Sequence, residues 1–335
     1  MEVLVREFQD VRRETPEARG TFHVEPSYGS LFHVERSAVS QNTVSGLSVT
    51  VYIARSVCTF IPARRLGMAL VVAIANQKGG VGKTTTAINL GTSLAVAEQR
   101  TLIVDIDPQG NATSGLGVEK RGSLPTVYDV LVDDRSVAEC LRNHVHFPFL
   151  SLVPSNRDLI GAEIELVNRP ERERVLSRAL GSVRNDYDFI LVDCPPSLGL
   201  LTLNTLVAAD SVLIPIQCEF YALEGLSQLL NTIRLVQRGL NRDLEIEGVL
   251  LTMYDRRLNL SKQVAEEARE YFGAKVFETT IPRNVRLAEA PGFGQPIITY
   301  DVLSAGAQSY LALAREMLQV RGRQLKKTVT KGVST

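Results

Sequence analysis

The feature that constrains this chain most is a glycine-rich segment around Gly80, which lies between an apolar run and a helical pattern. The apolar run at 70–75 is typical of a buried strand, and residues 87–96 have the spacing of a helix. Glycines let backbone N–H groups turn inward around phosphate oxygens without interference from a Cβ atom. A strand, a glycine-rich loop and a helix in this order predict a phosphate-binding loop rather than an incidental glycine-rich turn.

The side chains of this loop predict a nucleotide with a bound Mg²⁺. Lys83 is expected to reach the β- and γ-phosphates, and the hydroxyl of Thr84 is expected to hold the metal. The general pattern has a glycine where this chain has Gln77, and a second lysine, Lys78, comes directly before the glycine pair. The residues expected to contact ATP here are Lys78, Gly79, Gly80, Val81, Gly82, Lys83, Thr84 and Thr85.

Composition sets the class of protein. The 335 residues are 44% hydrophobic and 22% charged, which is enough for a substantial core. The 37 basic residues balance the 37 acidic ones, so a nucleic-acid surface would have to be a local patch. The four cysteines are far apart and form no C-x-x-C pair, which favours a reduced, cytoplasmic protein. No apolar run has the length of a membrane span, and no signal peptide opens the chain.

Apolar strands alternate with helical patterns from Met68 onward, which predicts an α/β fold: a mostly parallel, twisted sheet with helices on both faces. The strands are expected at 101–105, 150–153, 188–193, 211–216 and 247–252, with short ones at 275–280 and 296–299. The helices are expected at 125–131, 136–141, 158–180 with a break near Pro170, 201–209, 223–238, 259–272 and 305–320, before a basic, flexible tail at 321–335.

Three loops leave the carboxyl ends of apolar strands, where ligands bind in such folds. The first is the phosphate loop, the second begins at Asp105 and the third at Asp193. Asp193 has the position of a Walker B carboxylate, which would hold Mg²⁺ through water; a helix cap before Pro195 is the alternative. Asp105 and Asp107 are two apart on an extended chain, so both could face the nucleotide, and a turn role for Asp107 competes with this.

Residues 68–320 resemble the ParA family of P-loop ATPases, specifically the chromosomal Soj type, which acts in bacterial DNA segregation. The resemblance is carried by K-G-G-V-G-K-T-T-T (a deviant Walker A motif), V-D-I-D-P-Q-G-N-A-T-S-G-L-G, V-D-C-P-P-S-L-G and I-P-R-N-V-R-L-A-E-A-P. It implies a homodimer with ATP sandwiched between subunits, in which Lys78 of one subunit contacts phosphates in the other, as an arginine finger does elsewhere.

The resemblance also implies roles for single residues. Asp107 would orient the hydrolytic water, which makes Lys78, Lys83 and Asp107 the catalytic set, while Asp105 would support the loop and the metal. The segment 282–291 would border the adenine, with Pro282 and Asn284 at the nucleotide. Hydrolysis would loosen the dimer, so that the rate of ATP hydrolysis would set how long the dimer persists.

The implied partners are a ParB-type centromere-binding protein, which stimulates hydrolysis, and double-stranded DNA bound without sequence preference. The protein would then be nucleoid-associated. For each basic residue near the loops, taken alone, a solvated or salt-bridged surface charge is the leading alternative. The DNA-binding candidates are Arg256, Arg257, Arg283 and Arg286.

Three other classes of protein compete with this interpretation. A MinD-like membrane-cycling ATPase shares the phosphate loop, but the tail offers only Leu325 as a bulky apolar residue, so no stable membrane association is expected. An iron–sulfur reductase would need cysteines shared between subunits, and Cys140 and Cys194 are interpreted as ordinary thiols. A metabolic ligase similar to dethiobiotin synthetase is the third alternative, and only the phosphate loop supports it.

The first 67 residues differ from the rest, since they contain no lysine and repeat Phe-His-Val-Glu at 22–25 and 32–35. The repeat could arise by chance in a disordered extension, and a metal site from its histidines lacks further ligands. A third hypothesis is that each repeat is encoded by a CACGTG palindrome, similar to the DNA site of the ParA family's partner. Synthesis would then start at Met68 and leave 268 residues (335 minus 67) for one α/β domain.

Overall fold

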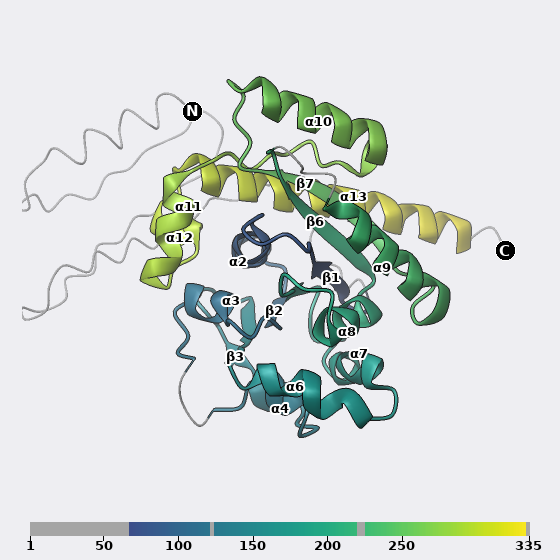
Figure 1. The fold of residues 1–335 in the computed structure, drawn as a ribbon. Helices are drawn as coiled ribbons and strands as arrows, with labels where there is room; N and C mark the ends of the chain where they lie inside the picture. The colour runs from purple at the N-terminus through teal and green to yellow at the C-terminus, as the bar shows by residue number, and fades with distance from the viewer. Residues whose placement is uncertain (1–66, 121–123, 220–224, 333–335) are drawn as a thin grey trace, which may run out of the picture. The chain divides into compact units, whose positions relative to one another are not determined.

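A seven-stranded sheet, in the order β3-β4-β2-β5-β1-β6-β7, forms the centre of the computed structural model (Figure 1). The structure describes residues 67–120, 124–219 and 225–332, with side chains as far as 322, so the expectations for residues 1–66 and 333–335 lie outside it. All pairs are parallel except the short edge pair β3–β4, which confirms the predicted mostly parallel sheet. The strands are β1 (Leu70–Ile74), β2 (Thr101–Asp105), β3 (Arg142–Asn143), β4 (Leu150–Val153), β5 (Phe189–Asp193), β6 (Ser211–Gln217) and β7 (Glu245–Thr252).

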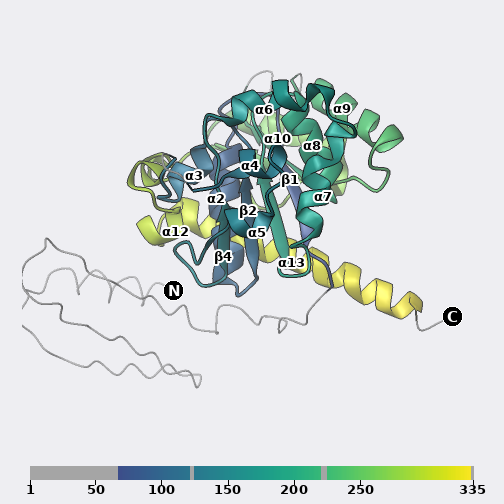
Figure 2. The ribbon, with the colours of Figure 1, turned by 90° about the horizontal axis from the view of Figure 1, so that it is seen from below.

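Successive side chains of each strand point to opposite faces of the sheet. Because these side chains are apolar on both faces, helices cover both. Val71 and Ala73 pack in one apolar cluster with α7, α8 and α9, and Val72 and Ile74 pack in another with α2 and α13. The helices around the sheet are seen from two sides in Figures 1 and 2. The longer helices are α2 (Lys83–Val96), α8 (Leu200–Ala208), α9 (Leu226–Gly239), α10 (Asn259–Phe272) and α13 (Ala305–Gly332). The shorter ones are α3 (Asn111–Gly115), α4 (Val127–Leu131), α5 (Val137–Cys140), α6 (Leu159–Glu165), α7 (Val175–Gly181), α11 (Val285–Glu289) and α12 (Ile297–Tyr300).

Two predicted strands are wrong. Residues 275–280 contain the end of a 3₁₀ turn, Gly273–Lys275, and one isolated bridge at Val276. Residues 296–299 begin α12 instead, because the Ile297 amide donates to Asn89 Oδ1 at 2.8 Å and so has the partner that the first turn of a helix needs. The five-residue helices α3 and α11 were not predicted.

The final helix is longer than the predicted 305–320 and continues to Gly332, where a flexible tail was expected. Arg321 ties this helix to the sheet: its Nη1 donates to the Asp188 carbonyl at 2.7 Å, and its guanidinium lies 4.6 Å from the Phe189 ring centroid. Near the other end of the helix, Tyr310 shares a hydrogen bond of 3.1 Å with Thr86 of α2. No helix in the described stretches combines the length and the apolar character that crossing a bilayer requires.

Candidate active site

The phosphate loop connects β1 to α2, as predicted. Gly80 and Gly82 have φ angles of 74° and 91°, in the left-handed region where a Cβ atom would be strained. Gly82 precedes the first residue of α2, so the loop amides and the amino end of this helix converge on one place. Such a place binds anions, because the helix dipole and the free N–H groups both favour negative charge.

The two lysines of the loop differ in surroundings. Lys83 is buried, and its Nζ donates to the Lys78 carbonyl at 3.1 Å. Burial lowers the pKa of Lys83, although the nearby Asp193 acts against this shift. The side chain of Lys78 is half-buried and has no ion-pair partner within the described stretches. The loop therefore holds one ammonium inside and leaves the other partly exposed.

Asp105 and Asp193 lie side by side at the carboxyl ends of β2 and β5, where they are register partners, and both are fully buried. Asp105 accepts hydrogen bonds from the Thr113 hydroxyl at 2.7 Å, the Thr113 amide at 2.8 Å and the Asp107 amide at 3.2 Å. Burial nevertheless raises the pKa of Asp105 to about 6. Asp105 is thus occupied by its own loop, as a supporting residue would be.

Asp193 is in the opposite situation: in the part of the chain that the structure describes, no hydrogen bond of good geometry reaches either carboxylate oxygen, although the Thr84 hydroxyl lies nearby. Burial and the charge of Asp105 raise the pKa of Asp193 well above its usual range, whereas the Thr84 hydroxyl and Lys83 lower it. A buried carboxylate without partners is costly unless it binds a cation. Asp193 and Thr84 together therefore fit a metal ion.

The kind of metal follows from how few protein ligands are available. No group of three or more histidine, cysteine or acidic side chains that could hold a metal occurs among the described residues. One carboxylate and one hydroxyl leave the remaining positions to phosphate oxygens and water, which is the coordination that Mg²⁺ prefers at nucleotides. The residues present thus fit Mg²⁺ brought together with a nucleoside triphosphate.

Asp107 lies directly after β2 in a turn that other residues fix. Its Oδ1 accepts from the Gln109 amide at 2.9 Å, which is the turn contact that competes with a catalytic role. Its carbonyl accepts from the Ser155 hydroxyl at 2.7 Å, and the Ser155 amide donates to the Thr113 hydroxyl at 2.9 Å. Sequence reasoning missed Ser155, although its place just after β4, at the same edge of the sheet, is a signal that could have found it.

The four candidate arginines come from the turn after β7 and from the neighbouring segment that leads into the first turn of α11. The Tyr254 amide donates to the Ile281 carbonyl at 3.0 Å, which brings the turn after β7 next to the segment before α11. Three of the guanidinium groups form ion pairs: Arg257 with Asp255 at 2.7 Å, Arg283 with Glu219 at 3.1 Å, and Arg286 with Glu289 at 2.9 Å and Asp301 at 3.7 Å. Arg256 is exposed and, within the described residues, has no ion pair.

Pro282 and Asn284, the residues expected near the adenine, lie at the start of α11. The Asn284 side chain accepts from the Arg286 amide at 2.8 Å, so it caps this helix. A second contact joins the region to the loop after α3: a Cβ atom on Gly117 would lie 2.9 Å from the Gly294 carbonyl oxygen, and one on Gly294 would lie 2.7 Å from the Gly117 Cα. The two backbones touch, and only glycine fits at either position.

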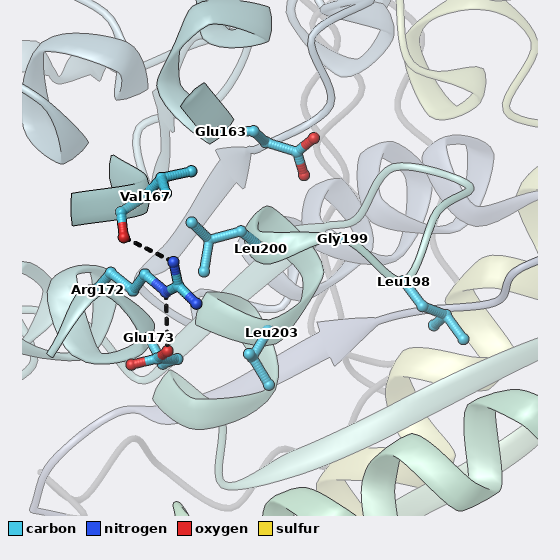
Figure 3. A pocket seen from close by; sticks show the side chains of 8 residues that line it. All are labelled: Glu163, Val167, Arg172, Glu173, Leu198, Gly199, Leu200 and Leu203. Carbon is cyan, nitrogen blue, oxygen red and sulfur yellow. Dashed lines mark hydrogen bonds and ion pairs between the residues drawn. The ribbon is translucent and has the colours of Figure 1, made fainter. Parts of the chain in front are cut away.

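A cavity of about 370 Å³ lies beside the loop that follows Asp193, and it was not predicted (Figure 3). Arg172 spans one wall, with its Nη1 donating to the Val167 carbonyl at 2.7 Å and its Nε to Glu173 at 3.1 Å. Its lining consists of Glu163, Val167, Arg172, Glu173, Leu198, Gly199, Leu200 and Leu203. It is lined mainly by leucines and acidic groups and lacks the loop amides and lysines of the phosphate loop.

The described cysteines are free and buried. Burial raises the pKa of Cys140 to about 11 and the pKa values of Cys194 and Cys218 to about 12. Thiols with such values are poor nucleophiles at neutral pH. This agrees with the interpretation of Cys140 and Cys194 as ordinary thiols; Cys58 lies outside the described residues.

Comparisons with known proteins were made for the sequence and for the fold. Residues 69–246 match the family described as AAA domain. The chain is 60% identical over 250 residues to the sporulation initiation inhibitor protein Soj of Bacillus subtilis, which covers 75% of this chain and 98% of that protein. It is 59% identical over 249 residues to the chromosome partitioning protein ParA of Myxococcus xanthus, with 74% and 88% covered.

Among solved structures, the chain is similar to cobyrinic acid a,c-diamide synthase from Mycobacterium smegmatis with bound ATP analogue and magnesium. The two are 40% identical with a TM-score of 0.64, over 74% of this chain and 93% of that one. That protein holds the two ligands that the geometry around Lys83, Thr84 and Asp193 fits.

Proposed function

The chain belongs to the ParA/Soj family of chromosome partitioning ATPases, and we propose that it works as a DNA-segregation switch that dimerises around ATP and Mg²⁺. The observation that carries the proposal is the unequal pair of lysines in one phosphate loop. Lys83 is buried and serves its own subunit, whereas Lys78 is half-buried and without an ion-pair partner in the described stretches. A partly exposed cation without an ion-pair partner among the described residues is available to a nucleotide held by a second copy.

The placement of the chain's own residues supports a role for each of them in this proposal. The loop amides and Lys83 bind the phosphates, and Thr84 with Asp193 would hold Mg²⁺, which supplies charge neutralisation on the phosphate oxygens. Asp105 keeps its loop in place through Thr113, and Asp107 orients the attacking water. Lys78 enters the partner's site and stabilises the charge that develops during phosphoryl transfer. Loss of the γ-phosphate then removes a group that both copies grip, and the dimer separates.

The test is the oligomeric state of a hydrolysis-deficient variant. We expect Asp107→Ala to form a persistent dimer with ATP and Mg²⁺, because it binds the nucleotide but cannot complete hydrolysis. The double variant Lys78→Ala, Asp107→Ala should stay monomeric while still binding ATP. Gel filtration with light scattering measures both, with the exposed and distant Asp243→Ala as the control. A monomeric, ATP-loaded Asp107→Ala variant would rule out the switch.

We propose that the dimer binds double-stranded DNA and is therefore associated with the nucleoid. We also propose that a ParB-type protein stimulates its ATP hydrolysis. Binding through phosphate contacts should weaken steeply with salt. Co-sedimentation with DNA and flotation with liposomes, both in ATP, separate this function from MinD-like membrane cycling. Binding to vesicles without binding to DNA would favour the membrane function.

A further inference from the structure

β6 extends further than its neighbour β1 at the carboxyl ends of the strands, where the phosphate loop lies. The pairing between β1 and β6 ends at Ile74 and Leu213, but β6 continues to Gln217. On the side that faces β1, the Pro215 carbonyl of β6 therefore has no strand amide from which to accept a hydrogen bond. Two buried side chains that no motif of the family resemblance includes, Asn76 and Thr252, connect this overhanging part of β6 to the phosphate loop.

Asn76 forms the first connection. Its side chain is 5% exposed, and its Nδ2 donates to the Pro215 carbonyl at 2.7 Å. Its Oδ1 accepts from the Lys78 amide at 3.0 Å. The same Lys78 offers its carbonyl to Lys83 Nζ at 3.1 Å. Asn76 thus fixes the peptide groups around Lys78 relative to the sheet, and with them the position of the Lys83 ammonium.

Thr252, the last residue of β7, forms the second connection. It is 2% exposed, and its hydroxyl lies 2.9 Å from the Val81 carbonyl oxygen and 3.2 Å from that of Ile216. One hydroxyl proton is shared between the two acceptors, one in the loop and one in β6. Its side chain also approaches Gly82, where a Cβ atom would lie 3.6 Å from the Thr252 methyl carbon. Thr252 therefore holds the loop at its last turn before α2.

We propose that Asn76 and Thr252 are positioning residues that hold the phosphate loop in its binding shape before the nucleotide arrives. A loop that is already ordered loses little conformational freedom on binding, so more of the interaction free energy appears as affinity. Without these donors, the carbonyls of Pro215 and Val81 would be left short of a partner in a buried region, and the loop would shift to find others. The inference rests on the proposed function only in that the loop binds Mg²⁺–ATP.

The experiment compares three single variants by calorimetric titration with Mg²⁺–ATP. Thr252→Val keeps the shape and removes the donor, and we expect it to weaken binding about tenfold, as the loss of one buried hydrogen bond does. Thr252→Ser restores the hydroxyl and should bind within about twofold of the wild type. Thr101→Val is the matched control, because its buried hydroxyl also donates to a carbonyl, that of Gln99 at 3.0 Å, at the opposite end of the sheet.

A second readout separates positioning from general stability. The melting temperatures of Thr252→Val and Thr101→Val without nucleotide should fall by similar amounts, while only Thr252→Val loses affinity. Equal loss of affinity in both, or wild-type affinity in Thr252→Val, would overturn the inference. If Thr252→Val does not fold, Asn76→Ala takes its place, and wild-type affinity in that variant would overturn the inference equally. Absence of Mg²⁺–ATP binding by the wild type would instead contradict the proposed function.

Discussion

At the scale of single residues, two buried carboxylates of the candidate site lower the stability of the folded chain. Asp105 and Asp193 are two buried carboxylates on adjacent strands, and within the described residues no hydrogen bond of good geometry reaches Asp193. Such an arrangement persists because the rest of the sheet determines it; Lys83 offsets part of its cost, and a bound metal cation would offset more. The metal-free chain should therefore be more stable without the charge of Asp193.

This leads to a prediction on the dependence of stability on pH. The pKa of Asp193 is raised in the folded chain, so folding favours the protonated form, and the wild type loses stability as the pH rises from the unfolded value of about 4 toward the folded one. Asp193→Asn has no such loss. In the presence of a chelator, the melting temperature of the variant should exceed that of the wild type by more at about pH 8 than at about pH 5. Parallel melting curves across this range would contradict the prediction.

The same variant should lose the stabilisation that ligands give. Binding of Mg²⁺–ATP raises the melting temperature of a protein that binds it only when folded. We expect a clear rise for the wild type and a much smaller one for Asp193→Asn, measured by thermal shift with and without Mg²⁺–ATP. A rise as large in the variant would show that Asp193 does not hold the metal.

The sequence was sufficient to place these residues at one site, but it could not reveal their partners. Asp105, Asp193 and Lys83 were predicted to meet because each is near the carboxyl end of an apolar strand, and parallel strands bring those ends to one edge. The contacts of Thr252 with Val81 and of Ser155 with Asp107 join positions 171 and 48 residues apart. No local pattern records such contacts, because they depend on where the strands end in space.

At the scale of elements, α2 lies unusually close to β2. A Cβ atom on Gly91 would lie 2.8 Å from Cδ1 and 2.9 Å from Cγ1 of Ile103, which is itself fully buried. Close packing of this helix on the sheet keeps the amino end of α2 at the phosphate loop. A glycine inside a helix normally costs stability relative to alanine, so its presence here has a steric reason.

We therefore expect Gly91→Ala to destabilise the protein by about 1–3 kcal/mol, the usual cost of overpacking, despite the better helix propensity of alanine. Gly181→Ala is the matched control, because it lies at the end of α7 and a Cβ atom there would contact nothing within 4 Å. Urea unfolding measures both. A neutral or stabilising Gly91→Ala would mean that Ile103 moves aside freely.

The elements that were mispredicted share a physical cause. Residues 296–299 contain two isoleucines and a threonine, a composition that favours a strand, yet the segment starts a helix because Asn89 of α2 accepts its first amide. The long parallel strands and helices were predicted well, since burial gives them strong patterns of their own. Short elements take their conformation from distant partners, which a single sequence does not show.

At the scale of the whole molecule, the candidate DNA surface is less basic than its arginines suggest. Arg257, Arg283 and Arg286 are each paired with a carboxylate, whereas Arg256 is exposed and has no ion pair in the described part of the chain. A phosphate would have to compete with those carboxylates for three of the four groups. Arg256 should therefore contribute most to DNA binding.

The prediction is that Arg256→Glu lowers the DNA affinity of the ATP-loaded protein more than Arg286→Glu does, and that it reduces the slope of affinity against salt by about one ion. Arg234→Glu, the same change of charge on the exposed side of α9, should leave DNA binding as it is. Fluorescence anisotropy at several salt concentrations measures all three. Equal losses for Arg234→Glu and Arg256→Glu would indicate a general effect of net charge.

The contact between Gly117 and Gly294 has a practical consequence for anyone who labels this protein. Two stretches of main chain, one after α3 and one after α11, meet with no side chain between them. A reporter peptide or fluorescent domain inserted into either stretch would separate the two stretches and abolish the ATPase activity. A fluorophore for imaging should be attached elsewhere, because the contact between Gly117 and Gly294 leaves no space for a label.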